Sequence, residues 1–272
     1  MLMSGEVGIL YNKDMKNAQI LAGDVQKLFA LKKIPTAVFT TDNLSKDVSI
    51  ALAIGGDGTI LRAARFYCQY EIGVLGINLG RLGFLSQSNP NEIENIADSI
   101  IQNNYTVQDR MMIEEETTQI AALNDIVIKS TEAGRTSKFK LFINNKFLCE
   151  YLADGIIIST PTGSSAYNLS AGGPVINPTL DVFVITAICP HTLSARPLVV
   201  PSNDIISITT CDSEETFNII GDGQITKKIT YNEITTIKKH ANKAKLIMIN
   251  KPGNDFYSIL RDKLYWGVAP SC

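Results

Sequence analysis

The chain has 272 residues, 45% of them hydrophobic and 19% charged, with a formal net charge of −2 at pH 7. This is an ordinary globular composition, with enough length for one large domain or two modest ones. The sequence contains no block of five or more basic residues, which argues against nucleic acid as a partner. It contains no apolar run near the roughly 18 residues that span a bilayer, and its start lacks the pattern of a signal peptide. We therefore expect no membrane partner.

The five cysteines are scattered and form no C-x-x-C pair. An odd number without such spacing favours neither a disulfide framework nor a zinc site. Free thiols persist in a reducing compartment, so we predict a cytoplasmic protein. Only two histidines are present, which excludes a metal site built on three of them, and we predict no dedicated metal-ligand cluster.

Strand-like and helix-like segments alternate over the first hundred residues. Apolar runs predict strands, whereas apolar residues three or four apart predict helices. This alternation is typical of a parallel sheet covered by helices, and we predict an α/β domain over residues 1–106. The predicted strands are 7–11, 36–39, 49–54 and 72–77, and the predicted helices are 16–31, 61–70 and 91–103. Ligands of such sheets bind at the carboxyl ends of the strands.

After about Thr106, short β-rich runs replace the helical pattern. We predict an antiparallel, all-β, sandwich-like domain over residues 107–251, with the run 245–249 as its last strand. Asn144-Asn145 and Gly221–Gln224 have the composition of hairpin turns. The end of the chain shows helical periodicity again, and we expect the segment 252–272 to return to the first domain to bury its apolar stripe.

The sequence Gly55-Gly56-Asp57-Gly58-Thr59 falls between a predicted strand and a predicted helix. Glycines at such a turn let the backbone approach a ligand closely and direct N–H groups at negative charge. A carboxylate there repels phosphate, so Asp57 would instead orient or deprotonate a hydroxyl beside it. This combination indicates phosphoryl transfer to an alcohol. The alternative is a plain turn, for which Asp and Gly are also favoured.

Two better-known phosphate loops are excluded. The chain has no G-x-x-x-x-G-K-[ST], and Leu61 stands where the dinucleotide fingerprint needs its third glycine. A second glycine-rich loop, residues 78–85, follows the fourth predicted strand. Gly80 and Gly83 would allow this loop to face the Asp57 turn, and Phe84 would pack on a flat ring or simply fill the core.

Asn124 and Asp125 interrupt an apolar strand pattern, and consecutive polar residues in such a run need partners if they are buried. An Asn side chain offers a donor and an acceptor to an adenine edge, and an Asp can accept from a ribose hydroxyl. A β-bulge on an exposed edge is the alternative.

The segment 154–167 is the richest in polar groups. A predicted strand leads into a loop that holds Ser159, Thr160, Thr162, Ser164 and Ser165. Hydroxyls and backbone amides at this density can bind a nucleotide. The alternative is a loop whose Ser164 or Ser165 caps a helix.

Together these segments resemble the NAD kinase family. The matching motifs run in the family's order and are residues 55–59, 78–84, 124–125, 154–167, 170–174 and 190–197. The first is shared with lipid kinases and phosphofructokinases, whereas the long segment from Asp154 is far more specific. A lipid or diacylglycerol kinase with the same glycine-rich loop is the alternative.

The resemblance implies phosphorylation of the 2′-hydroxyl of the adenosine ribose of NAD, with ATP or polyphosphate as donor, to give NADP. Asp57 would orient or deprotonate that hydroxyl, and Gly58 and its neighbours would hold phosphates. Mg²⁺ or another divalent cation would be held mainly through donor phosphates. The other positions implied to bind NAD are Arg62, Phe84, Asn124, Asp125, Arg135, Asp154, Thr162, Ser165, Ala166, Tyr167, Ser170, Ala187 and Gln224.

Three positions depart from the family's pattern. Asp125 replaces the usual Glu, Ser165 replaces the usual Thr, and Leu152 stands where many members carry a basic residue. The last change affects one contact on the nicotinamide side but not the reaction.

The resemblance also implies a homo-oligomer, a tetramer built from dimers, with the site shared between subunits. A length argument points the same way, because an extended strand would separate Asp154 from Thr162 by roughly 25 Å. A dinucleotide is only about that long, so one chain would not easily use both ends of the segment. We expect one chain to supply the loop 165–167 and its neighbour to supply Asp154.

Overall fold

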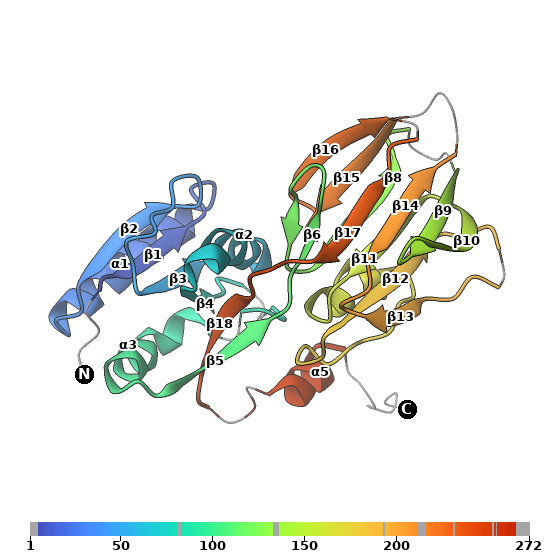
Figure 1. The fold of residues 1–272 in the computed structure, drawn as a ribbon. Coiled ribbons are helices and arrows are strands. Elements are labelled where there is room, and N and C mark those ends of the chain that lie inside the picture. The colour runs from blue at the N-terminus through green and yellow to red at the C-terminus, as the bar shows by residue number, and fades with distance from the viewer. Residues whose placement is uncertain are drawn as a thin grey trace. The chain divides into compact units, whose positions relative to one another are not determined.

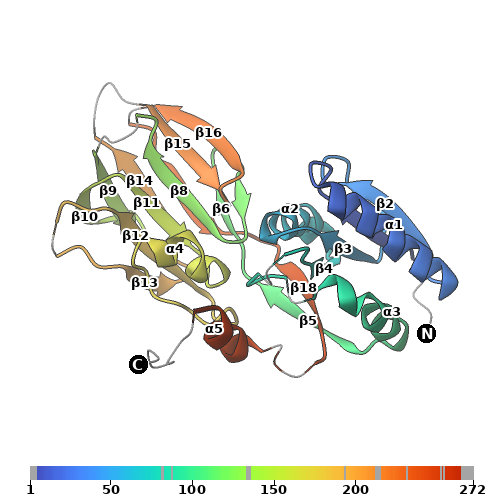
Figure 2. The same cartoon turned by 180° about the vertical axis from the view of Figure 1, so that it is seen from behind.

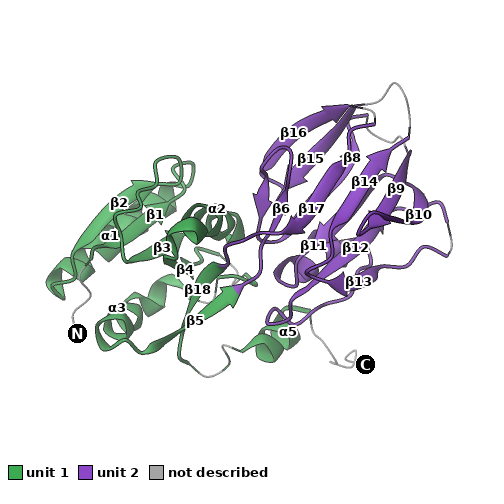
Figure 3. Cartoon of the chain, in the orientation of Figure 1, with its two compact units in different colours: residues 1–109, 244–272 green, residues 110–243 purple. Residues whose placement is uncertain are grey.

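The computed structural model describes residues 5–80, 83–86, 88–132, 136–192, 194–211, 216–230, 232–251, 253 and 255–264. The chain divides into two compact units (Figure 3). One contains residues 1–109 and 244–272, and the other contains residues 110–243.

The first unit is built on a six-stranded sheet in the order β2-β1-β3-β4-β18-β5 (Figure 1). The pairs β1–β2, β1–β3, β3–β4 and β4–β18 are parallel, which confirms the predicted α/β class. The strands are β1 (Val7–Tyr11), β2 (Thr36–Thr40), β3 (Ile50–Ile54), β4 (Gly73–Ile77), β5 (Tyr105–Arg110) and β18 (Ala244–Ile249). The helices are α1 (Lys16–Leu31), α2 (Asp57–Tyr67), η1 (Cys68–Tyr70), η2 (Pro90–Glu92), α3 (Ile93–Gln102) and α5 (Phe256–Leu264).

Helices cover both faces of this sheet (Figure 2). The alternation of side chains along β4 sends Leu75 and Ile77 into a core shared with α1 and α3. Gly76, between them, faces α2, where a Cβ would lie 2.2 Å from the side chain of Ile60. Glycine at that position therefore lets α2 pack closely on the sheet.

Helix α2 begins earlier than the sequence predicts. The glycine-rich segment does not precede the helix as a loop: Asp57, Gly58 and Thr59 form its first turn, and Gly56 is the extended residue before it. A carboxylate in the first turn is stabilised by the positive end of the helix dipole. Asp57 thus lies at a helix N-terminus directly beyond the carboxyl end of β3.

Strand β18 belongs to the first sheet. Its position in the sequence had led us to place it in the β-rich domain, and that prediction is wrong. Lys245 and Leu246 pair in parallel with Gly73 and Val74 of β4. An apolar run of this length reports burial on both faces but not which sheet will bury it. The docking of α5 onto the first domain stays a prediction.

The second unit is a sandwich of two antiparallel six-stranded sheets, in the orders β10-β9-β14-β17-β6-β7 and β13-β12-β11-β8-β15-β16. Their inner faces share one hydrophobic core, which includes Phe139, Phe183 and Phe217. The strands are β6 (Ile113–Glu115), β7 (Ala121–Ala122), β8 (Asp125–Ser130), β9 (Ser137–Ile143), β10 (Lys146–Ala153), β11 (Gly155–Ser159), β12 (Val182–Ile188), β13 (Leu198–Pro201), β14 (Ile206–Thr210), β15 (Thr216–Gly221), β16 (Ile225–Thr230) and β17 (Thr235–Lys239). Two short helical turns, η3 (Thr162–Ser165) and α4 (Tyr167–Ser170), follow β11.

Both predicted hairpin turns are confirmed. Asn144 and Asn145 have φ of 50° and 64° between β9 and β10, and Asp222 and Gly223 have φ of 51° and 65° between β15 and β16. A two-residue hairpin loop favours a turn with positive φ at both residues, because the twist of that turn matches the twist of the flanking strands. The second of these turns borders the candidate site.

Candidate active site

In the first unit, the Asp57 carboxylate is held by the glycine-rich loop that follows β4. Its Oδ2 accepts from the backbone N–H of Phe84 at 3.0 Å. Its Oδ1 accepts from the N–H and the hydroxyl of Ser86 at 3.3 and 3.1 Å. The predicted approach of this loop to the Asp57 turn is therefore confirmed, and Phe84 contributes through its backbone.

Two glycines make this arrangement possible. A Cβ on Gly83 would lie 1.9 Å from an oxygen of Asp57, so only glycine allows the loop to pass so close. Gly55 has a φ of 157°, and a Cβ there would lie 2.3 Å from the hydroxyl of Thr59. These contacts fix the direction of the carboxylate, while part of Asp57 remains exposed to solvent.

Ser86 is a residue that sequence reasoning missed. It is fully buried, and its hydroxyl accepts from the side chain of Asn78 at 3.0 Å and from the N–H of Gly83 at 2.9 Å. It then donates to Asp57. The Asn78 motif thus reaches Asp57 through Ser86.

The structure describes only one of the two predicted basic residues. Arg62 lies one turn into α2, is exposed, and pairs with Asp42 at 3.0 Å. Arg135 lies outside the described residues. Gly58 is exposed in the first turn of α2.

The second unit contains a cavity of about 410 Å³ on the outer face of its β8–β15–β16 sheet. Four predicted residues line it together, namely Asn124, Asp125, Ala166 and Tyr167. Because side chains alternate along a strand, Asp125, Val127 and Lys129 of β8 face this cavity while Ile126 and Ile128 enter the sandwich core. The cavity therefore combines an apolar floor with a few polar groups, as ligand sites commonly do.

Asn124 and Asp125 do not form a bulge on an exposed edge. β8 lies between β11 and β15, well inside its sheet, and Asp125 is only 4% exposed. That alternative is wrong, and the burial leaves a carboxylate that needs a partner.

The hydroxyl-rich loop after β11 is bound to the backbone of residues 123–124. The N–H of Thr160 donates to the carbonyl of Asn124 at 2.9 Å, and the hydroxyl of Thr160 donates to the carbonyl of Leu123. Gly163 passes so close that a Cβ would lie 2.0 Å from the carbonyl oxygen of Asn124. The two segments that the sequence singled out thus meet.

The helix-cap alternative for this loop is wrong. The Ser164 hydroxyl accepts from the N–H of Ile176 at 2.9 Å and donates to the carbonyl of Pro161 at 2.6 Å. No side chain caps α4. These contacts add to those with residues 123–124, and Ala166 and Tyr167 of the loop lie at the cavity.

The other predicted residues of this unit do not line the cavity. Thr162 is buried, Ser165, Asp154 and Ala187 are half-buried, and Ser170 and Gln224 are exposed. The cavity instead gains residues that the sequence did not single out, namely Lys129, Asp222, Gly223 and Thr226. Only the hairpin signal of Asp222-Gly223 marked any of them, and it indicated a turn.

Tyr167 borders the cavity, is 41% exposed and is affected by the charges of several other groups. Burial raises the pKa of Tyr167, and the charges of Cys189, Asp125 and Asp154 raise it further. The chain turns back after β11, and α4 packs on that strand. The sharing of the site between subunits stays a prediction.

Burial raises the pKa of Asp125 to about 7, and the nearby charge of Asp222 contributes. An acid with a raised pKa binds more protons in the folded than in the unfolded state. Its contribution to stability is then present below its ordinary pKa of 3.8 and is lost as the pH rises through about 7.

We therefore expect Asp125→Asn to gain stability relative to the parent protein as the pH rises from about 5 to about 8. The amide has the same shape but no charge to bury. Urea unfolding of both proteins across this range measures the difference. A difference in unfolding free energy that does not change with pH would contradict the raised pKa.

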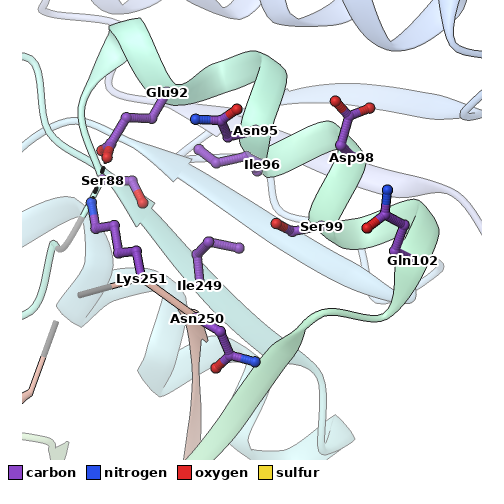
Figure 4. A pocket seen from close by; sticks show the side chains of 10 residues that line it. All are labelled: Ser88, Glu92, Asn95, Ile96, Asp98, Ser99, Gln102, Ile249, Asn250 and Lys251. Atoms are coloured by element: carbon purple, nitrogen blue, oxygen red, sulfur yellow. Dashed lines mark hydrogen bonds and ion pairs between the residues drawn. The ribbon is translucent and has the colours of Figure 1, made fainter.

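A smaller cavity, of about 240 Å³, lies in the first unit beside α3 and the residues after β18 (Figure 4). Its charged residues are already paired. Lys251 contacts Glu92 at 2.6 Å, and Asp98 contacts Lys32 at 2.5 Å. It matches none of the predicted site residues.

Within the ranges that the structure describes, no three or more His, Cys, Asp or Glu side chains gather as a metal site. Those ranges also include no helix long and apolar enough to cross a membrane.

Comparisons with known proteins agree with both units. The family model for the ATP-NAD kinase N-terminal domain matches residues 2–105, and the model for the ATP-NAD kinase C-terminal domain matches residues 123–249. These matches define the class of protein, a phosphotransferase of the kinase type. The chain belongs to the NAD kinase family, which confirms the resemblance seen in its sequence. The lipid kinase alternative finds no support.

Individual relatives support membership of the same family. An NAD kinase of Thermoanaerobacter sp. (strain X514) is 42% identical over 232 residues, covering 83% of this chain and 81% of that protein. An NAD kinase of Hydrogenovibrio crunogenus is 37% identical and covers 95% and 91%.

Two solved structures share the fold at 23% identity. An NAD kinase from Archaeoglobus fulgidus in complex with ATP has a TM-score of 0.75, covering 92% of this chain and 95% of that one. Yeast NADH kinase complexed with NADH has a TM-score of 0.80, covering 97% and 89%.

Proposed function

We propose that the chain transfers a phosphoryl group from ATP to the 2′-hydroxyl of the adenosine ribose of NAD, giving NADP. The observation that carries this assignment is Asp57, a half-buried carboxylate fixed at the N-terminus of α2 by Phe84 and Ser86. Family membership supplies the substrate class. The solved relatives in complex with ATP and with NADH support a nucleotide donor and a dinucleotide acceptor.

Asp57 acts on the hydroxyl rather than on the phosphate. Each carboxylate oxygen has two lone pairs, so Asp57 can accept a further hydrogen bond while the loop contacts remain. The ribose oxygen forms a bond to phosphorus, the bond between that phosphorus and the departing ADP oxygen breaks, and the hydroxyl proton passes to Asp57. The amides at the start of α2, including that of Gly58, favour phosphate nearby.

The second unit holds the adenosine half of NAD. Asn124 offers a donor and an acceptor to the adenine edge, and ionised Asp125 accepts from a ribose hydroxyl. Ala166 and Tyr167 border the same cavity and provide apolar surface for the ring. Ser165 and Thr162 support this loop, while Asp154, Ser170 and Ala187 serve the nicotinamide half, as the family resemblance implies. We keep Arg62, Arg135 and Gln224 as predicted contacts.

A divalent cation such as Mg²⁺ would be bound mainly by the phosphate oxygens of the donor. Such an ion needs few protein ligands, and no three or more His, Cys, Asp or Glu side chains of the described residues gather to bind one directly. When bound, the ion neutralises charge on the transferring phosphoryl group.

One coupled assay tests the proposed function. Purified protein is incubated with Mg²⁺, NAD or NADH, and ATP or polyphosphate, and NADP or NADPH is read by a specific dehydrogenase. Formation of NADP from NAD and ATP supports the assignment. Its absence under every combination would refute it. The other arms give the donor range and the preference between NAD and NADH.

We also propose a cytoplasmic homo-oligomer, a tetramer in which Asp154 serves the NAD of a neighbouring subunit. Four cysteines in the described residues are free, as expected in a reducing compartment. Large apolar side chains are exposed along the β9–β10 hairpin, including Phe147 at 60% and Leu148 at 47%. Exposed apolar surface on an edge strand favours association with another chain.

We expect Asp154→Ala and Asp57→Asn, each impaired alone, to recover partial activity when co-assembled. Mixed oligomers would contain some sites with both residues intact. The assay compares verified mixed oligomers, separated by two affinity tags, with the same proteins mixed without exchange. If verified mixtures show no recovery, Asp154 serves its own chain or only its fold.

A further inference from the structure

Asp222 lies in the turn between β15 and β16, is 8% exposed, and points its carboxylate at a different part of the chain. It accepts from the backbone N–H groups of Leu123, Asn124 and Asp125 at 3.1, 2.7 and 3.4 Å. Its own N–H donates to the carbonyl of Asp125 at 3.0 Å. These contacts join residues nearly one hundred positions apart in the sequence.

The contacts are more than a hairpin turn requires. The turn needs positive φ at two successive residues, which Asp222 and Gly223 supply at 51° and 65°. An Asn-Gly pair would serve it equally well. A buried carboxylate is not part of that requirement, and its three donors lie in residues 123–125, which follow β7 and include the first residue of β8.

That segment is held from two sides. The N–H groups of residues 123–125 donate to Asp222, whereas the carbonyls of Leu123 and Asn124 accept from Thr160. Asp222 lines the same cavity as Asn124 and Asp125. The Asp222 carboxylate therefore contacts the backbone that carries both of these side chains.

We propose that Asp222 is a positioning residue for NAD: its carboxylate fixes the backbone of residues 123–125 so that Asn124 and Asp125 face the bound adenosine. This inference rests on the proposed binding of NAD by the second unit. Hydrogen bonds to a charged acceptor are stronger than neutral ones, which suits a residue that must prevent a binding segment from shifting.

The same carboxylate also affects the charge of Asp125. Asp222 and the half-exposed Tyr167 line the same cavity as Asp125, with Lys129 four residues further along β8, and Asp154 and Cys189 act on Tyr167. After burial, Asp222 is the cause of the raised pKa of Asp125. Removing its charge should let Asp125 ionise at lower pH. A turn residue whose charge did not reach Asp125 would leave that pH dependence unchanged.

The test is Asp222→Asn, which keeps the preferred turn pair and removes the charge. One of the two side-chain atoms facing the backbone N–H groups becomes a donor itself, so the segment loses part of its support. The control is Asn145→Asp, which makes the reverse exchange in the other hairpin turn, where the residue is exposed and its φ is 64°.

NAD binding is measured by calorimetry from about pH 5.5 to pH 8.5, alongside thermal unfolding. We expect Asp222→Asn to remain folded and to bind NAD about tenfold or more weakly at high pH, equivalent to about 1.4 kcal/mol. In the parent protein, binding should strengthen as the pH rises through about 7, and in the variant this rise should occur at lower pH. Asn145→Asp should match the parent in both.

Parental affinity and an unchanged pH profile in Asp222→Asn would overturn the inference and leave Asp222 as a turn residue. If Asp222→Asn does not fold, Asp222→Glu decides, because it keeps the charge but displaces the carboxylate. Weaker binding with the parental pH profile then supports positioning, and parental affinity overturns it. A parent protein that fails to bind NAD would instead refute the proposed function.

Discussion

Asp57→Asn should lower the turnover rate by about 10²–10⁴-fold, the usual loss when a general base is removed. The amide has nearly the shape of the carboxylate and can keep one hydrogen bond to the loop of Phe84 and Ser86, but it cannot take a proton. NAD affinity should be nearly unchanged, because the carboxylate is assigned to the hydroxyl's proton and not to holding the dinucleotide.

The measurement is kcat under saturating NAD and ATP, with NAD binding by calorimetry and thermal unfolding as companions. The matched control is Ser86→Ala, which removes a hydrogen bond to Asp57 at 3.1 Å but keeps the carboxylate. It should lose far less activity than Asp57→Asn. Activity of Asp57→Asn within a few-fold of the parent would show that Asp57 is not the base.

Local patterns predicted most elements of the fold. Helix α1 has its predicted bounds, and of the apolar residues that indicated it Val25 and Phe29 are buried, whereas Ile20 is exposed. The start of α2 was missed because three glycines resemble a loop, whereas the sheet and the helix dipole stabilise a helical turn there. β18 was assigned to the wrong sheet because pairing between distant strands leaves no local signal.

The residues of the candidate site also divide into those with a local sequence signal and those without one. Asp57, Asn124 and Asp125 were found because a polar residue within a glycine-rich or apolar context is unusual. Ser86 and Asp222 were missed, since a lone serine and an Asp-Gly turn are common in any protein. Their importance comes from contacts made 29 and nearly one hundred residues away, which no spacing reveals.

Gly163→Ala should destabilise the second unit and weaken NAD binding together. An added Cβ would lie 2.0 Å from the carbonyl oxygen of Asn124 and 2.6 Å from its Cα. These are backbone atoms, so no side-chain rotation relieves the clash. Forcing extra volume into a packed site typically costs about 1–3 kcal/mol.

The strain must separate the loop of Ser165–Tyr167 from Asn124, and with it the two walls of the proposed adenosine site. We therefore expect a lower unfolding free energy in urea and a higher KM for NAD, with a smaller effect on kcat because Asp57 lies in the other unit. Gly23→Ala is the control, since a Cβ there meets nothing within 4 Å and lies in helix α1, where alanine is favoured. Parental stability and KM in Gly163→Ala would mean that the close approach of loop and strand does not shape the site.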